Sequence, residues 1–75
     1  MYAVTAADRD IQAVEMAARL SREHQGWWVH WGCWSREYWA FPLFDAPRGS
    51  VFSDRDPGAL AARLRQAEMT ARRRT

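Results

Sequence analysis

The sequence predicts one small α+β domain in the order α-β-β-β-α, with a three-stranded antiparallel sheet and two helices. Apolar residues recur at helical spacing near both ends of the chain, and β-forming aromatic residues are concentrated between them. Loop-forming residues divide that middle region into three segments. A chain of 75 residues can fill only one core, so residues 1–75 are expected to form a single domain, with flexible ends at 1–5 and 72–75.

The first element is a helix, expected from Ala6 to His24. Its polar residues share one face, as in an amphipathic helix that packs on a core. The opposite side is broad and apolar, and it consists of Ile11, Val14 and Ala18 beside Ala13, Ala17 and Leu20.

A β-hairpin follows, with strands expected at 27–34 and 37–41 and with Pro42 closing the second strand, because proline cannot donate a ladder hydrogen bond. Side chains alternate between the two faces of a strand. A three-residue loop at 34–36 would place Trp31 opposite Trp39 and direct one continuous apolar set toward the helices. A slip of one residue would reverse every assignment.

A short third strand is expected at Ser50–Ser53, followed by a second helix. Asp56 is placed to cap that helix, and Pro57 suits the first helical position, where no amide donor is needed. The apolar stripe of this helix consists of Leu60, Leu64, Ala67 and Ala71.

The hairpin carries the strongest indication of function. With both helices packed on one side, the outer side would bear an aromatic set that is unusual for a solvated sheet, and exposed apolar area of this kind typically marks a partner site. The alternative is that another segment of the chain covers these rings. The sequence favours a small non-enzymatic interaction or accessory module that binds a protein partner or a second copy of itself. The expected partner-binding residues are Trp28, His30, Trp34 and Tyr38, with Arg36 at the rim.

Nucleic-acid binding is the alternative function, because exposed rings can stack on bases and all eleven basic residues are arginines. The element order resembles that of double-stranded-RNA-binding domains. That family has a basic cluster at the start of its second helix, where this chain has Asp56 and Pro57, and the net charge is only +2. A small-molecule pocket between sheet and helices is the third possibility.

Catalytic or metal chemistry is not expected, and no cofactor is predicted. The soft metal ligands are His24, His30 and Cys33, and the last two stand three residues apart on a strand, so they should point to opposite faces. Cys33 is expected to be a buried structural thiol. The lone cysteine, the lack of a signal-like segment and the lack of a long apolar run favour a cytoplasmic protein without a membrane span.

Part of the sequence resembles a group of short, uncharacterised Trp-rich proteins of high-GC bacteria. The matching pattern is Trp27-x-Val29-x-Trp31-Gly32, then Ser35-Arg36-x-Tyr38-Trp39-Ala40-x-Pro42, then a helix that opens with Asp56-Pro57. This resemblance implies a fold and no activity. The chain is also similar to the MbtH-like accessory proteins of peptide synthetases, which are small, Trp-rich and built on a three-stranded sheet. Their Ser-Leu-Trp-Pro segment is replaced here by residues 38–42.

Overall fold

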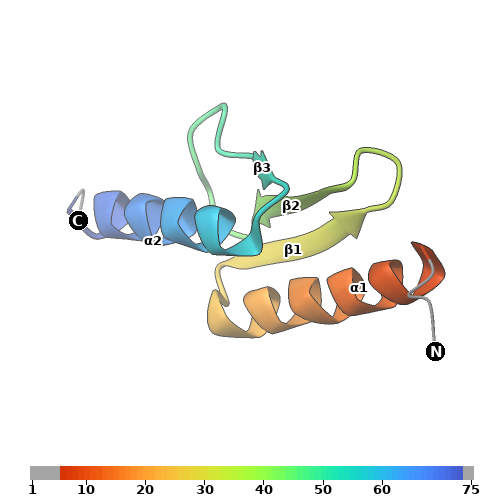
Figure 1. Cartoon of the computed structure of the whole chain (residues 1–75). Coiled ribbons are helices and arrows are strands. Elements are labelled where there is room, and N and C mark those ends of the chain that lie inside the picture. The colour runs from red at the N-terminus through yellow and green to blue at the C-terminus, as the bar shows by residue number, and fades with distance from the viewer. Residues whose placement is uncertain (1–5, 74–75) are drawn as a thin grey trace.

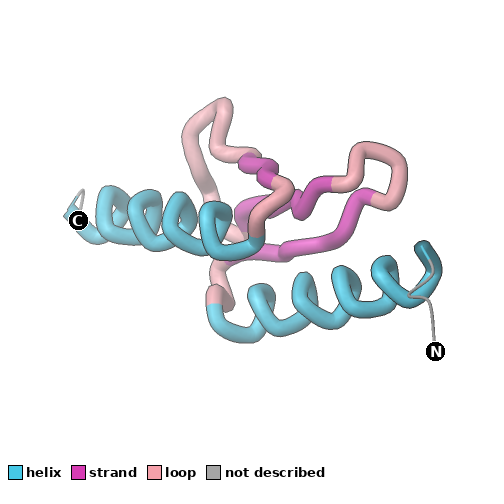
Figure 2. The backbone as a smooth tube through the Cα atoms, in the orientation of Figure 1, coloured by secondary structure: helices cyan, strands magenta, loops and turns pink. Residues whose placement is uncertain are grey.

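The computed structural model describes residues 6–73 and has the predicted α+β architecture (Figures 1 and 2). The three strands form one antiparallel sheet in the order β1-β2-β3. The elements are α1 (Ala6–Glu23), β1 (Trp27–Gly32), β2 (Glu37–Pro42), β3 (Phe52–Asp54) and α2 (Pro57–Arg73).

The expected flexible ends are only partly described. Residues 1–5 and 74–75 lie outside the described residues. Arg72 and Arg73 were expected in a flexible tail, but they are the last two residues of α2. The C-terminal half of α2 extends beyond the ends of the strands in Figure 1.

The core lies between the helices and one face of the sheet, which we call the inner face. Both helices contribute to it, and Ala40 of β2 is completely buried within it. The buried cluster consists of Ala13, Ala17, Leu20, Trp27, Val29, Tyr38, Ala40, Leu60, Ala61 and Leu64.

Two polar contacts fix α1 in place. The Ser21 hydroxyl donates to the carbonyl oxygen of Val29 at 3.1 Å and accepts from the amide of the same residue at 2.8 Å. Because β1 is an edge strand, Ser21 satisfies backbone groups that have no strand beside them. Just after the C-terminal end of α1, one turn from Ser21, the buried His24 places Nδ1 2.8 Å from Oε1 of Glu68 on α2.

The start of α2 is as predicted. The Asp56 carboxylate accepts from the amide of Gly58 at 3.0 Å, which is the capping contact expected one residue before Pro57. Leu60 and Leu64 are fully buried one turn apart. The cap and these two leucines therefore orient α2 on the sheet.

The predicted hairpin register is wrong by one residue. Trp31 pairs with Tyr38, and Val29 pairs with Ala40. The turn has four residues, Cys33–Arg36, instead of three, and Arg36 adopts a left-handed conformation with φ of 60°.

Gly32 explains why this register is favoured. A Cβ at Gly32 would lie 2.7 Å from Oγ of Ser35 and 2.9 Å from Nε1 of Trp39, so only glycine lets these two side chains lie against the strand. Trp39 therefore belongs to the face opposite the core, and its neighbour Tyr38 turns inward.

The observed register and the four-residue turn contradict three expectations about individual residues. Tyr38 is only 8% exposed and belongs to the core, so it does not lie on the outer face as predicted. Trp34 is 98% exposed, but it lies in the turn and not on a strand face. Cys33 also lies in the turn and is exposed, so the prediction of a buried thiol is wrong.

Candidate functional site

Three rings form a continuous cluster on the outer face of the hairpin. Trp28 and His30 stack with centroids 5.0 Å apart and planes 12° apart. Phe41 contacts both, at 5.5 Å from Trp28 and 5.9 Å from His30. We call Trp28, His30 and Phe41 the outer cluster. Trp28 remains 52% exposed, and the other two rings are partly buried.

Trp39 extends this face toward the turn. It pairs with His30, so the two side chains share the outer face. Its indole N–H donates to Oγ of Ser35 at 2.9 Å, so its polar atom is satisfied within the chain. The ring can therefore present apolar surface to a partner without leaving a donor unpaired.

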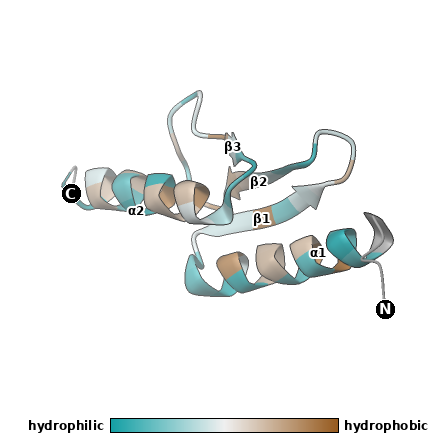
Figure 3. Cartoon of the chain, viewed as in Figure 1, coloured by the Kyte–Doolittle hydropathy of each residue, from teal (hydrophilic) through white to brown (hydrophobic). Residues whose placement is uncertain are grey.

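A second apolar surface lies on α1. The predicted apolar side of this helix divides into two halves, of which one is buried in the core and the other is bare. Val14 is 55% exposed, and Ile11 and Ala18 are exposed with it. We call Ile11, Val14 and Ala18 the α1 stripe; Figure 3 shows hydrophobic segments recurring along α1, whereas much of the strand surface is pale.

A groove joins the outer cluster to the α1 stripe. It encloses about 510 Å³ between α1 and β1. The outer cluster, the groove and the stripe thus form one surface, which we call the docking surface. The groove is lined by Val14, Ala17, Ala18, Ser21, Arg22, Trp28, Val29, His30 and Trp31.

The docking surface carries opposite charges near its two ends. Arg22 lines the groove beside Trp28. Glu37 pairs with Gly32 at the turn end of the hairpin and shares the outer face with Trp39 and Phe41. Between them the surface is aromatic and aliphatic.

A nearby charge pair belongs to α1 alone. Nε of Arg19 donates to Oε1 of Glu23 at 2.8 Å across one helical turn. This hydrogen bond holds the pKa of Glu23 below its usual value and raises that of Arg19. Both side chains are largely exposed, so the pair contributes little to stability.

The structure brings together only part of the set predicted from the sequence. Trp28 and His30 lie on the outer face, as the alternation along β1 indicates. Arg36 instead contacts α1, where it pairs with Asp10, and its guanidinium lies 5.1 Å from the Trp31 ring. The indole N–H of Trp31 donates to the same Asp10 carboxylate at 3.1 Å.

Sequence reasoning missed Phe41, Trp39 and the α1 stripe. For Phe41 and Trp39 the signal was Gly32, whose missing side chain makes room for a ring on that face. The α1 stripe could have been predicted from the width of the apolar side of α1, which is greater than one edge of the sheet can cover.

Within residues 6–73, no three His, Cys, Asp or Glu side chains come together in a way that could hold a metal ion. Neither of the two helices, over the part of the chain described, is long and apolar enough to cross a membrane.

Comparisons with protein-family models, with curated proteins and with solved structures found no match. The resemblances drawn from the sequence motifs therefore stay predictions.

Proposed function

We propose that this chain is a protein-interaction module, and that its docking surface binds a second copy of the chain. The observation that carries the proposal is the continuity of the exposed apolar surface. The half-exposed Trp28 lies at the junction of the outer cluster and the groove, and the exposed Val14 lines the opposite wall. Tryptophan is enriched among the residues that carry most of the binding energy at the centre of protein interfaces.

The charges favour a second copy as the occupant. A two-fold axis through the outer cluster would bring Arg22 of one copy toward Glu37 of the other, and it would do so twice. Such a self-complementary arrangement is what a symmetric dimer requires. Opposite charges at the rim then fix the orientation in which the apolar centres meet.

The size of the chain supports the same proposal. A domain of 75 residues buries a modest fraction of its surface and often gains stability through oligomerisation. Half of the apolar side of α1 finds no cover within the described residues. Association would bury this side together with the aromatic rings.

Light scattering coupled to gel filtration, from micromolar to millimolar concentration, tests the proposal. We expect the mass to rise from one copy to two. Trp28→Ala should raise the dissociation constant by about thirtyfold, because truncating a central tryptophan costs about 2 kcal/mol.

Trp34→Ala is the matched control, because it removes an equally large ring that is 98% exposed and outside the outer cluster. We expect this variant to dimerise like the parent chain. A strict monomer at millimolar concentration contradicts self-association, and equal loss in both variants contradicts the location of the surface.

The nucleic-acid alternative gains no support from the geometry. The arginine expected at the rim, Arg36, is engaged with Asp10 and Trp31 on the inner side. Titration with DNA and RNA at two salt concentrations would test it, since phosphate contacts weaken steeply with salt.

A further inference from the structure

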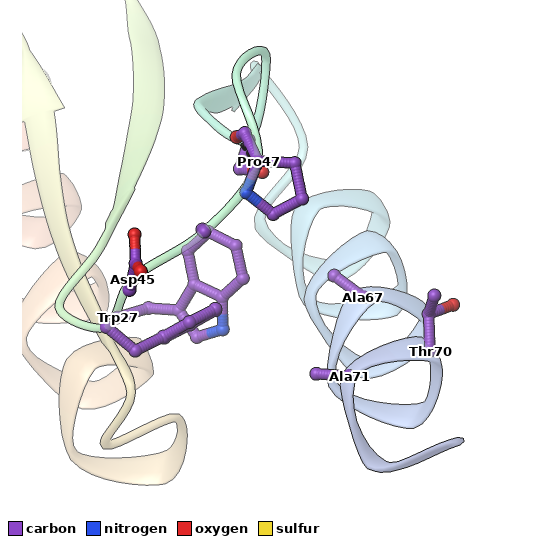
Figure 4. A pocket seen from close by; sticks show the side chains of 9 residues that line it. Trp27, Asp45, Pro47, Ala67, Thr70 and Ala71 are labelled. Atoms are coloured by element: carbon purple, nitrogen blue, oxygen red, sulfur yellow. Dashed lines mark hydrogen bonds between the residues drawn. The ribbon is translucent and has the colours of Figure 1, made fainter. Parts of the chain in front are cut away.

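A second cavity lies away from the docking surface, between α2 and the connection from β2 to β3. It encloses about 340 Å³, which is within the usual range of small-molecule pockets. Figure 4 shows Trp27 on one side of it, with Ala67, Thr70 and Ala71 of α2 opposite. The lining residues are Trp27, Phe44, Asp45, Ala46, Pro47, Ser50, Ala67, Thr70 and Ala71.

Trp27, which lines this cavity, carries a buried hydrogen-bond donor without a partner. The side chain is 1% exposed. Its Nε1 is the one buried side-chain nitrogen or oxygen, among residues 6–73, that has no hydrogen-bond partner. In Figure 4 this nitrogen lies on the edge of the ring that faces α2. Buried indole N–H groups usually find an acceptor, so this one indicates a missing partner.

The other polar groups of the cavity are acceptors. The Ser50 hydroxyl donates its proton to the carbonyl oxygen of Pro47 at 2.6 Å, and the Thr70 hydroxyl donates to that of Gln66 at 3.1 Å. Each oxygen keeps its lone pairs for a ligand donor. The exposed Asp45 adds a carboxylate at the rim.

We infer that the cavity binds a small, mostly apolar molecule with an uncharged carbonyl group at its buried end and a hydrogen-bond donor at its outer end. The carbonyl oxygen accepts from Nε1 of Trp27. The apolar body fills the space beside Ala67 and Ala71, and the outer donor meets Asp45 or Thr70. An anionic ligand is disfavoured because Asp45 would repel it.

The ring that can move to admit a ligand is Phe44, which lines the cavity and contacts Trp27. Nε1 is covered in the empty cavity, so a ligand must displace a neighbouring group to reach it. The Phe44 ring meets the Trp27 ring edge-on with centroids 5.3 Å apart, and it is 40% exposed on a loop. This ring can move outward at little cost in buried area.

The test uses proton–nitrogen correlation NMR spectra of the full chain, in which each tryptophan gives its own indole N–H signal. Acetophenone is the probe, and ethylbenzene is its matched control, with the same carbon skeleton and no oxygen. We expect acetophenone to bind about fivefold more tightly and to shift the Trp27 signal downfield, as one neutral hydrogen bond would. Para-aminoacetophenone, which adds an outer donor, should bind more tightly still.

Two variants locate the binding. Ala67→Leu fills the cavity and should abolish the shift, whereas Ala62→Leu, on the exposed side of α2, should leave it unchanged. Trp27→Phe should reduce the affinity for acetophenone to that for ethylbenzene.

Three results overturn the inference: no probe moves the Trp27 signal, ethylbenzene binds as tightly as acetophenone, or Ala67→Leu binds the probe like the parent chain. A shift of the Trp27 signal with protein concentration alone also overturns it, since a second copy would then fill the cavity. These readouts do not depend on Trp28, so they distinguish this cavity from the docking surface.

Discussion

Trp28 and His30 stack on each other although both belong to β1, with their rings 5.0 Å apart and nearly parallel. They stand two residues apart on one face of the strand, where side chains are neighbours along its length. Phe41 on β2 contacts both rings and completes the outer cluster. His30 therefore contacts both other rings of the outer cluster, with Trp28 as the exposed anchor beside it.

Replacing His30 should weaken the dimer without unfolding the chain. We expect His30→Ala to raise the dissociation constant by roughly tenfold, because the outer cluster loses one ring and Trp28 loses its stacking partner. His30→Phe keeps a ring in place and should retain association. Sedimentation equilibrium measures both, and circular dichroism confirms the fold. Unchanged association of His30→Ala would exclude the outer cluster as the interface.

The orientation of the two copies is testable by charge exchange. Arg22→Glu and Glu37→Arg should each weaken association several-fold, because each places like charges together at both ends of a symmetric interface. The double variant restores opposite charges, so it should recover most of the affinity. Light scattering at low and high salt measures the effect. Additive losses in the double variant would argue against this orientation.

Ser21 should matter to stability far more than its size suggests. Ser21→Ala leaves the amide and carbonyl of the buried Val29 without their partner, so we expect it to reduce the free energy of unfolding by about 1–3 kcal/mol. Ser50→Ala removes a hydroxyl that makes an exposed contact and should cost much less. Urea unfolding of the two variants makes the comparison, and equal losses would contradict a special role for Ser21.

Tyr38 should make the fold sensitive to alkali. Burial raises the pKa of its hydroxyl above the ordinary value of 10.0, so the folded state holds the proton more tightly than the unfolded state. Its contribution to stability is complete below pH 10.0 and declines as the pH rises above that value. Thermal unfolding across alkaline pH should show this decline in the parent chain and a flatter profile in Tyr38→Phe. The same decline in both would assign it to another group.

The sequence predicted the fold class because its signals were redundant. Helical spacing, the Asp56 cap and the division of the aromatic segment all indicated the same element order. The register of β2 was not predictable from burial, because both of its faces are apolar: Tyr38 and Ala40 on one, Trp39 and Phe41 on the other. A pattern that is hydrophobic on both sides gives no preference between the two registers.

The outer-face position of Trp28 and His30 on β1 was therefore predicted, whereas that of Trp39 and Phe41 on β2 was missed. Alternation placed Trp28 correctly once its neighbours Trp27 and Val29 were buried. On β2 the deciding feature was local and steric, namely the room that Gly32 leaves for Trp39. The cavity beside Trp27 depends on how a loop and a helix meet, and no short sequence pattern reports such a tertiary contact.

Both edges of the described sheet are blunted. On the β1 edge, the Ser21 hydroxyl hydrogen-bonds both the amide and the carbonyl oxygen of Val29. The other edge strand, β3, has only three residues, and the Arg63 guanidinium donates to the carbonyl oxygen of Ser53 at 3.0 Å. An incoming chain thus finds little backbone to template further strands, so growth into fibrils is disfavoured. Copies that associate through their exposed aromatic faces should therefore form a closed dimer without further assembly, and stay in solution even when the protein is concentrated.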